Sequence, residues 1–286
     1  MANFSLDASK DNYCVMGNPV AHSKSPKIHT AFAAQTNQAI HYQSILVEEN
    51  GFPEALEQFQ RMGGKGINIT VPFKQEAWQV TRTFITDRAD LAQAVNTIWF
   101  DAEKNYHGDN TDGIGLIRDL TINHKISLTG MNILIAGAGG AVRGIVGPLC
   151  DEQPSKIVIA NRTLSKAENL ANIFSDRCEI AASNFEDLVD EKFDVIINGT
   201  STSLQNKVPP IPEHLIKGSF CYDLMYSNSD TTFISWAKKH KAADAIDGLG
   251  MLVEQAAESF YIWRGLKPDT VPVIDMLREQ GSGVRG

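Results

Sequence analysis

The chain has 286 residues, of which 43% are hydrophobic and 21% charged, and its 26 Lys and Arg against 34 Asp and Glu give a net charge of −8. This composition is typical of a folded protein of about two domains, and it excludes disordered, collagen-like and disulfide-scaffold classes. No run of Lys or Arg occurs, so a nucleic-acid partner is not expected, because backbone binding needs clustered cations. Because the net charge is negative, any bound anion must be held by a few polar or positively charged groups at one local site and not by the overall charge of the protein.

The cysteines and the N-terminal segment indicate the cellular setting. Cys14, Cys150, Cys178 and Cys221 lie at least 28 residues apart and form no Cys-x-x-Cys pair. We therefore expect free thiols and no metal site. The N-terminus lacks a basic stretch followed by an apolar one, and no apolar run reaches about 18 residues. The expectation is a cytoplasmic protein without a membrane span.

The first part of the chain alternates short apolar runs with longer segments of helical periodicity. The expected strands are 13–17, 41–47, 66–70 and 96–100, and the expected helices include 26–37 and 52–63. A polar turn over 101–105 lies between two β-rich runs and predicts a hairpin. The first part should therefore contain a mixed sheet.

From Met131 onward the alternation is more regular. Six β-rich runs, at 132–137, 156–160, 178–182, 193–198, 219–224 and 241–247, predict a doubly wound parallel sheet. Residues 249–266 and a segment near 271–280 predict two helices, which should pack back on the first part of the chain. The expected fold is α/β, with a substrate-binding domain at 1–112, completed by 248–286, and a Rossmann domain at 113–247.

A glycine-rich turn follows the expected strand 132–137 and opens a helix. It comprises Gly137, Ala138, Gly139, Gly140 and Ala141. Glycines let a pyrophosphate approach the backbone, and the helix N-terminus supplies free N–H groups. Val142 stands where the six-residue fingerprint has its third glycine. The turn predicts a dinucleotide site, and a purely structural turn is the alternative.

The end of the next expected strand indicates which dinucleotide binds. NAD sites place an acidic residue there, whereas this chain has Asn161, Arg162 and Thr163, with Lys166 one turn later. A guanidinium suits a 2′-phosphate, because its planar fork binds phosphate oxygens. The residues favour NADP(H), and an ordinary surface arginine is the alternative.

Ser23 and Ser25 precede an expected helix whose first residue is Pro26. Their two hydroxyls can form a pocket for a small carboxylate. Simple capping of the helix by Ser25 explains the pattern equally well.

Further polar residues stand at the ends of expected elements. Asn68 and Thr70 share one face of a strand, Lys74 follows the next turn, Asn96 begins a strand and Asp112 precedes a helix. Clefts in α/β folds form at such ends, so these residues predict a site for a small polar substrate.

The ordered set of motifs resembles the shikimate dehydrogenase family from about Tyr13 to Pro268. The matching stretches are GNPVAHSKSPKIH, GINITVPFK, AVNTI, DNTDGIG, GAGGA, ANRT and DGLGMLVEQAAESFYIWRG. The resemblance implies a substrate domain, an NADP-binding Rossmann domain and a returning helix. It also implies reversible, NADPH-dependent reduction of 3-dehydroshikimate to shikimate, in the pathway to chorismate and the aromatic amino acids.

The resemblance implies roles for individual residues. Lys74 and Asp112 match the catalytic pair, in which the ammonium stabilises and protonates the carbonyl oxygen. The residues that match substrate contacts are Ser23, Ser25, Asn68, Thr70, Asn96, Tyr226 and Gln255. Those that match cofactor contacts are Gly137, Ala138, Gly139, Gly140, Ala141, Asn161, Arg162, Thr163, Lys166, Thr200, Ser201, Met225, Gly248 and Met251.

Three departures from the family pattern stand out. The chain has NGTSTSLQNK at 198–207 where the family commonly has Asn-Ala-Thr-Ser, SNSDTTF after Tyr226 where prolines are usual, and Lys166 where arginine is frequent. A quinate/shikimate dehydrogenase with relaxed cofactor use and a non-catalytic NADP-binding sensor are the alternative functions. The expected partner is the small-molecule substrate, and the sequence leaves monomer and homodimer open.

Overall fold

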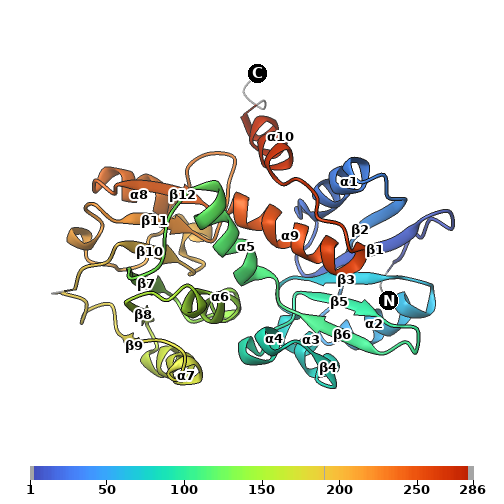
Figure 1. Ribbon diagram of the computed structural model, residues 1–286, viewed down its shortest axis with the longest axis horizontal. Coiled ribbons are helices and arrows are strands. Elements are labelled where there is room, and N and C mark those ends of the chain that lie inside the picture. Colours follow the sequence, from blue (N-terminus) through green and yellow to red (C-terminus); the bar gives the residue numbers. More distant parts are fainter. Residues whose placement is uncertain (1–2, 190, 283–286) are drawn as a thin grey trace. The chain divides into compact units, whose positions relative to one another are not determined.

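The computed structural model describes residues 3–189 and 191–282 (Figure 1). The chain divides into two compact units. Unit 1 comprises Met1–Asp112 and Val253–Val273, and unit 2 comprises Gly113–Leu252 and Ile274–Gly286. No helix among the described residues is long and apolar enough to cross a membrane.

Unit 1 is built on a mixed sheet of six strands in the order β2-β1-β3-β5-β6-β4. Its elements are β1 (Asp11–Gly17), α1 (Ser25–Gln35), β2 (Ile40–Leu46), α2 (Phe52–Arg61), β3 (Gly66–Ile69), α3 (Lys74–Thr81), β4 (Phe84–Ile85), α4 (Asp87–Ala92), β5 (Thr97–Phe100) and β6 (Tyr106–Asp109). β1 pairs in parallel with β2 and β3, whereas β5 is antiparallel to β3 and β6. The predicted mixed sheet and its hairpin are confirmed.

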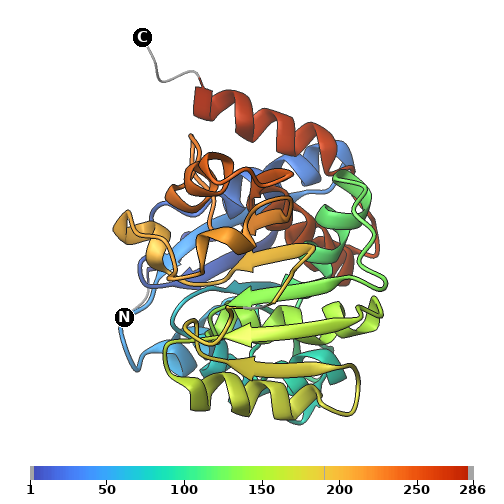
Figure 2. The same cartoon turned by 90° about the vertical axis from the view of Figure 1, so that its left-hand side faces the viewer.

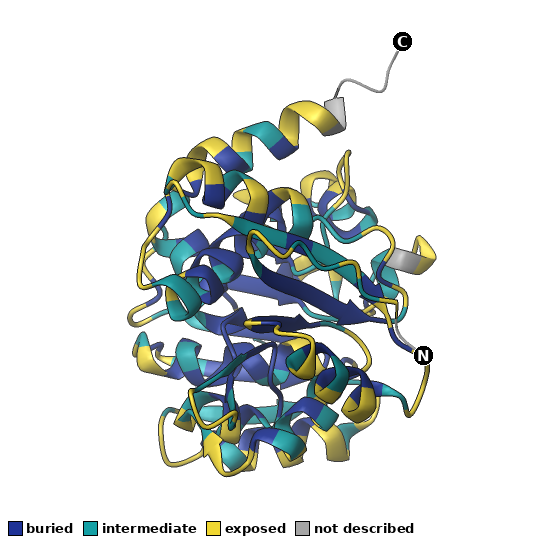
Figure 3. Cartoon of the chain, turned by 90° about the vertical axis from the view of Figure 1, so that its right-hand side faces the viewer, coloured by how far each residue is buried: buried dark blue, intermediate teal, exposed yellow. Residues whose placement is uncertain are grey.

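The sheet of unit 1 has a well-packed apolar core. Strands β1 and β3 are almost wholly buried (Figure 3). Phe52 and Phe59 from α2 and Phe73 before α3 are fully buried in this core. Burying such rings contributes roughly 1.5–3 kcal/mol each, and the packing holds the strand ends that carry the polar residues.

Unit 2 has a parallel sheet in the order β12-β11-β10-β7-β8-β9 (Figure 2). Its elements are α5 (Asp112–Arg118), a π-helical turn (Asp119–Asn123), β7 (Asn132–Ala136), α6 (Gly140–Asp151), β8 (Lys156–Ala160), α7 (Leu164–Phe174), β9 (Ile180–Ser183), β10 (Val195–Asn198), two 3₁₀ turns (Thr202–Gln205 and Glu213–Leu215), β11 (Phe220–Asp223), α8 (Thr232–Lys239) and β12 (Asp244–Asp247). The strand order reverses between β7 and β10, which is the Rossmann pattern predicted from the sequence.

Two helices follow β12, α9 (Leu249–Arg264) and α10 (Val271–Ser282). The second part of α9 packs on unit 1 as predicted, where Trp263 Nε1 donates to the carbonyl of Ile98 at 3.1 Å. The sequence-based division assigned all of 248–286 to the first domain, and the structure divides this segment differently. Residues from Ile274 onward belong to unit 2, where Arg278 donates to both carboxylate oxygens of Asp247.

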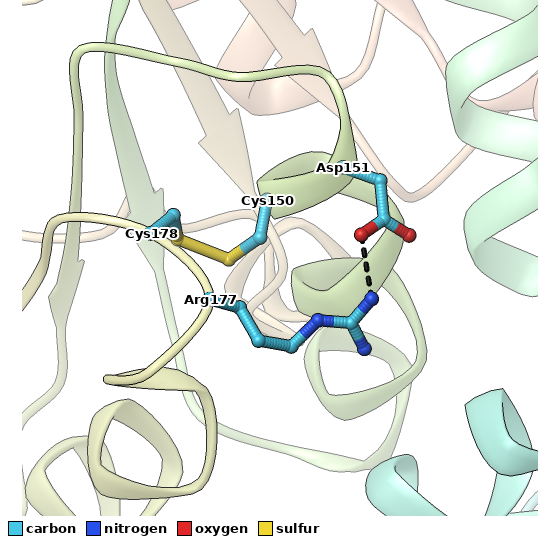
Figure 4. Close-up of a disulfide and its surroundings, with 4 residues drawn as sticks. All are labelled: Cys150, Asp151, Arg177 and Cys178. Atoms are coloured by element: carbon cyan, nitrogen blue, oxygen red, sulfur yellow. Dashed lines mark hydrogen bonds and ion pairs between the residues drawn. A yellow bond between two sulfur atoms is a disulfide. The ribbon is translucent and has the colours of Figure 1, made fainter.

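The expectation of four free thiols is wrong for one pair. Cys150 at the end of α6 and Cys178 before β9 form a disulfide, with their Cα atoms 5.4 Å apart (Figure 4). Beside it Arg177 donates to Asp151 at 2.6 Å. Parallel β8 and β9 bring segments 28 residues apart within reach of each other, which cysteine spacing alone does not reveal. Cys14 and Cys221 are free and buried.

Candidate active site

Lys74 and Asp112 form an ion pair in unit 1. Lys74 is the first residue of α3, and its Nζ donates to Oδ2 of Asp112, the first residue of α5, at 2.5 Å. The Lys74 side chain is 17% exposed and the Asp112 side chain 8% exposed. The pair is therefore mostly buried, and a small part of Lys74 remains accessible to a ligand. Two groups 38 residues apart in the chain thus meet.

Asn96 precedes β5 and contacts the same carboxylate. Its Nδ2 donates to Oδ1 of Asp112 at 2.7 Å and lies 3.4 Å from Oε1 of Gln255 on α9. Asp112 therefore accepts from Lys74 through one oxygen and from Asn96 through the other. The structure brings together four predicted site residues, Lys74, Asn96, Asp112 and Gln255.

Asn68 and Thr70 lie at the end of β3. Asn68 is 7% exposed, and its Oδ1 accepts from the hydroxyl of Tyr42 at 2.7 Å. Its Nδ2 donates to the carbonyl of Asn96 at 3.2 Å, so both the oxygen and the nitrogen of the Asn68 amide have hydrogen-bond partners in the protein. Thr70 comes directly after the strand and is half-buried.

Ser23 and Ser25 occupy the start of α1 in a different way from the one predicted. Lys24 is the N-cap residue, and no side chain caps the helix. Ser25 begins the helix, and its backbone N–H donates to Oγ of Ser23 at 3.3 Å. The capping explanation for Ser25 is therefore wrong, because Ser25 already lies inside the helix and no side-chain hydrogen bond caps it.

His29 is a buried polar residue that the sequence analysis missed. It lies one turn after Ser25, is 1% exposed and stacks on Tyr42 with ring centroids 4.3 Å apart. Neither ring nitrogen has a partner with hydrogen-bond geometry among the described residues, although the Asn68 side chain lies close enough to oppose the lowering of the His29 pKa. Burial lowers the pKa of His29 to about 3, so the imidazole is neutral at ordinary pH. The sequence signal that could have identified His29 is its i, i+4 spacing from Ser25, which places both residues on the same face of the helix.

The glycine turn in unit 2 has the shape that a phosphate group needs. Gly137 has a φ of +106°, and a Cβ there would lie 3.1 Å from the carbonyl oxygen of Gly199. A Cβ at Gly139 or Gly140 would meet nothing within 4 Å, so the backbone is open. Ala138 and Ala141 add only methyl groups, and α6 begins at Gly140. The open turn at a helix N-terminus therefore fits a pyrophosphate.

The end of β8 carries two exposed cations. Arg162 and Lys166 are exposed, and within the described part of the chain neither side chain has an ion-pair or hydrogen-bond partner. Asn161 Nδ2 donates to the carbonyl of Thr163, which caps α7. Unneutralised charges beside an open glycine turn fit the extra phosphate of NADP(H).

The remaining predicted cofactor residues follow the carboxyl ends of β10, β11 and β12. They are Thr200 and Ser201, Met225, and Gly248 and Met251, and the predicted substrate residue Tyr226 follows Met225. Gly248 donates its N–H to the carbonyl of Met225 at 3.1 Å, and a Cβ there would lie 2.6 Å from the carbonyl of Leu224. Only glycine therefore fits at 248.

Asp223, at the end of β11, organises these loops and was also missed. It is fully buried and accepts from Asn198 Nδ2, the backbone N–H of Met225 and the hydroxyls of Ser203 and Thr231. Burial raises the pKa of this carboxyl, and the hydrogen bonds oppose the rise. The sequence signal that could have identified Asp223 is its position as a charged residue at the end of an apolar strand.

Three family models match the chain in order. Residues 15–98 match the shikimate dehydrogenase substrate binding domain, 120–208 match the shikimate/quinate 5-dehydrogenase model, and 248–281 match the shikimate 5′-dehydrogenase C-terminal domain. Together they cover both units.

Full-length relatives support the same assignment. The shikimate dehydrogenase (NADP(+)) of Hahella chejuensis is 53% identical over 270 residues, which are 94% of this chain and 99% of that protein. The crystal structure of an Ael1 enzyme from Pseudomonas putida is 41% identical with a TM-score of 0.89, covering 93% of this chain and 98% of the other. That of a shikimate dehydrogenase from Aquifex aeolicus is 32% identical with a TM-score of 0.83, covering 98% and 100%.

Proposed function

The chain belongs to the shikimate dehydrogenase (NADP(+)) family, and from that premise we propose that it catalyses the reversible reduction of 3-dehydroshikimate to shikimate with NADPH. The observation that carries the proposal is the shielded Lys74–Asp112 pair, whose Nζ and Oδ2 lie 2.5 Å apart. An ammonium held at that spot is the group that carbonyl reduction requires.

Bound NADPH supplies the hydride. Negative charge then develops on the carbonyl oxygen of the substrate, and Lys74 Nζ stabilises that charge and donates the proton. Asp112 holds the ammonium in place and accepts from Asn96 on its other oxygen. In the oxidative direction the same groups remove the proton from the hydroxyl.

The chain's own residues fit the cofactor. Gly137 to Ala141 present an open backbone for the pyrophosphate, and Arg162 with Lys166, both exposed, are proposed to bind the 2′-phosphate. Thr200, Ser201, Met225, Gly248 and Met251 are proposed to line the nicotinamide. The cofactor is NADP(H), as in the relative's name.

Substrate recognition is proposed for a second set of residues. The Ser23 and Ser25 hydroxyls are proposed to bind the substrate carboxylate, with Thr70, Gln255 and Tyr226 contacting the ring. Asn68 Oδ1 accepts from the Tyr42 hydroxyl, and its second lone pair is proposed to accept from the substrate. Asn96 Oδ1 already accepts from the Thr111 N–H and the Thr97 hydroxyl, so Asn96 is proposed to contact the substrate through Nδ2. We also propose a cytoplasmic enzyme that is a monomer or homodimer.

Initial rates with shikimate or quinate, each paired with NADP⁺ or NAD⁺, test the function. The highest kcat/KM should belong to shikimate with NADP⁺. Comparable rates with quinate and NAD⁺ would instead identify a quinate/shikimate dehydrogenase with relaxed cofactor use. Binding of NADP⁺ without turnover of either alcohol would identify a non-catalytic sensor.

A further inference from the structure

Three hydroxyl side chains form a buried cluster beside the Lys74–Asp112 pair. Thr97 begins β5, Thr111 precedes α5 and Ser259 lies on α9, and all three are fully buried. Ser259 Oγ lies 2.7 Å from Thr97 Oγ1 and 3.3 Å from Thr111 Oγ1. We call Thr97, Thr111 and Ser259 the hydroxyl cluster. The sequence analysis assigned none of them a role.

The orientation of the Asn96 amide is defined by the backbone N–H of Thr111 together with the Thr97 hydroxyl of the cluster. The backbone N–H of Thr111 can only donate, and it lies 2.9 Å from Asn96 Oδ1, so this atom is the amide oxygen. The Thr97 hydroxyl donates to the same oxygen at 2.9 Å. Asn96 Nδ2 must then point to Asp112, as the 2.7 Å contact shows.

The cluster also holds the Asn68 amide. Asn68 Nδ2 donates toward Ser259 Oγ at 3.0 Å and Thr97 Oγ1 at 3.2 Å, and the backbone carbonyl of Asn96 accepts from the same nitrogen. The carbonyl can only accept, so the Asn68 orientation is defined as well. One set of hydroxyls therefore ties two site amides from different strands to α9.

We propose that the hydroxyl cluster consists of positioning residues, which hold Asn96 so that its N–H donates to Asp112 and keeps that carboxylate aligned with Lys74. A rotated Asn96 amide would place its oxygen against Asp112, and two acceptors would then repel each other. The Lys74 ammonium would shift with its partner. This inference rests on the proposed function, because it assigns the cluster to the proton-transfer step.

Variants that remove the hydroxyl but keep the side-chain shape, and variants that keep the hydroxyl, distinguish a positioning role of the hydroxyl cluster from a role in packing alone. Thr97→Val keeps the shape and removes the hydroxyl, whereas Thr97→Ser keeps the hydroxyl. Ser259→Ala is a smaller change, and it replaces Thr97→Val in the test if the Thr97→Val variant does not fold. Thr81→Val is the matched control, because Thr81 is equally buried in unit 1 and its hydroxyl donates only within α3, to the carbonyls of Ala77 and Trp78.

We expect Thr97→Val and Ser259→Ala to lower kcat for shikimate oxidation roughly 10-fold, since small displacements of reacting groups carry large rate penalties. KM for NADP⁺ should be unchanged, Thr97→Ser should restore most of the rate, and Thr81→Val should keep wild-type kcat. Values of kcat within about 2-fold of wild type for Thr97→Val and Ser259→Ala, whatever their Tm, would overturn the proposal.

A crystal structure of Thr97→Val gives a readout that does not depend on activity. The proposal requires the Asn96 amide to turn or withdraw from Asp112, and an unchanged Asn96–Asp112 hydrogen bond would contradict it. Failure of the proposed function is a separate result, since it would show as a wild-type protein that does not oxidise shikimate.

Discussion

Lys74 combines a charge, a carboxylate partner and access from solvent, and these properties define what its removal should do. We predict that Lys74→Ala lowers kcat by roughly 10²-fold or more with little change in KM for shikimate, the usual result of losing an acid–base group. Lys65→Ala, at an exposed lysine of the same unit, is the control. A near-normal kcat for Lys74→Ala would remove this residue from the mechanism.

Arg162 differs from Lys74 in having no protein partner among the described residues, so its effect should fall on a ligand. We predict that Arg162→Ala raises KM for NADPH at least about 10-fold, the range expected for a lost charged hydrogen bond, while KM for NADH stays constant. NADH thus serves as the internal control. Equal losses for the two cofactors would mean that Arg162 does not recognise the 2′-phosphate.

His29 should make stability depend on pH. The folded protein holds it neutral, with a pKa of about 3, whereas the unfolded chain takes up a proton below about pH 6.5. Stability is therefore lost as pH falls, by about 1.4 kcal/mol per pH unit below 6.5. Between pH 7 and pH 5 the wild type should lose about 2 kcal/mol more than His29→Phe in urea titrations.

His29→Gln provides the same comparison if the phenylalanine variant does not fold. Identical pH slopes for the wild type and both variants would show that His29 takes up its proton equally in the folded and unfolded states.

At the scale of elements, the departure from the dinucleotide fingerprint at Val142 and the departure from the family pattern at Gly199 compensate each other. Val142 on α6 replaces the third glycine of the fingerprint, and Gly199 after β10 stands where the family commonly has alanine. A Cβ at 199 would lie 2.3 Å from Val142 Cγ2, and a valine in a helix has little rotamer freedom. Helix and strand can pack here only if one of the two residues is small.

We therefore predict that Gly199→Ala costs about 1–3 kcal/mol of stability and that Val142→Ala reduces this cost. A double-mutant cycle in urea should give a coupling energy above about 0.5 kcal/mol. Additive effects of the two substitutions would show that the loop moves away from α6 instead.

The elements themselves were largely predictable. Alternating apolar runs located the strands of both sheets except the two-residue β4, and the regular alternation with helices predicted the doubly wound parallel sheet of unit 2. The helix start at Ser25 was predicted with the wrong cap, because Lys24 adopts the capping position without a side-chain hydrogen bond. Local sequence preferences do not include the tertiary contacts that shift a helix by one residue.

At the scale of the whole molecule, the chain passes between the units three times, and its C-terminal helix contributes to unit 2. Asp247 is buried at 7% exposure, and its carboxylate accepts from Arg278. We predict that Arg278→Met lowers the unfolding free energy by about 1–2 kcal/mol, since it leaves a buried carboxylate without that partner while the arginine itself is half-exposed.

Lys238→Met is the matched control, because its ion pair with Asp230 in the same unit is about half-exposed on both sides. Exposed pairs contribute little, so this variant should keep nearly wild-type stability in urea titrations. Equal losses of unfolding free energy in the two variants would show that the Arg278–Asp247 pair stabilises the protein no more than an exposed ion pair does.

The sequence by itself determined the class of fold and the glycine turn, because these depend on local periodicity and on residue types at fixed spacing. It also determined the family, through the ordered set of motifs, and that resemblance proposed roles for Lys74, Asn96 and Asp112. Only the tertiary structure decided which groups meet. It paired Cys150 with Cys178, placed Arg278 on Asp247, and enclosed the Asn68 amide in hydroxyl groups from α9 and β5. Such contacts join residues 28 to 191 positions apart, and the packing of sheets and helices sets them, whereas local spacing carries no record of them.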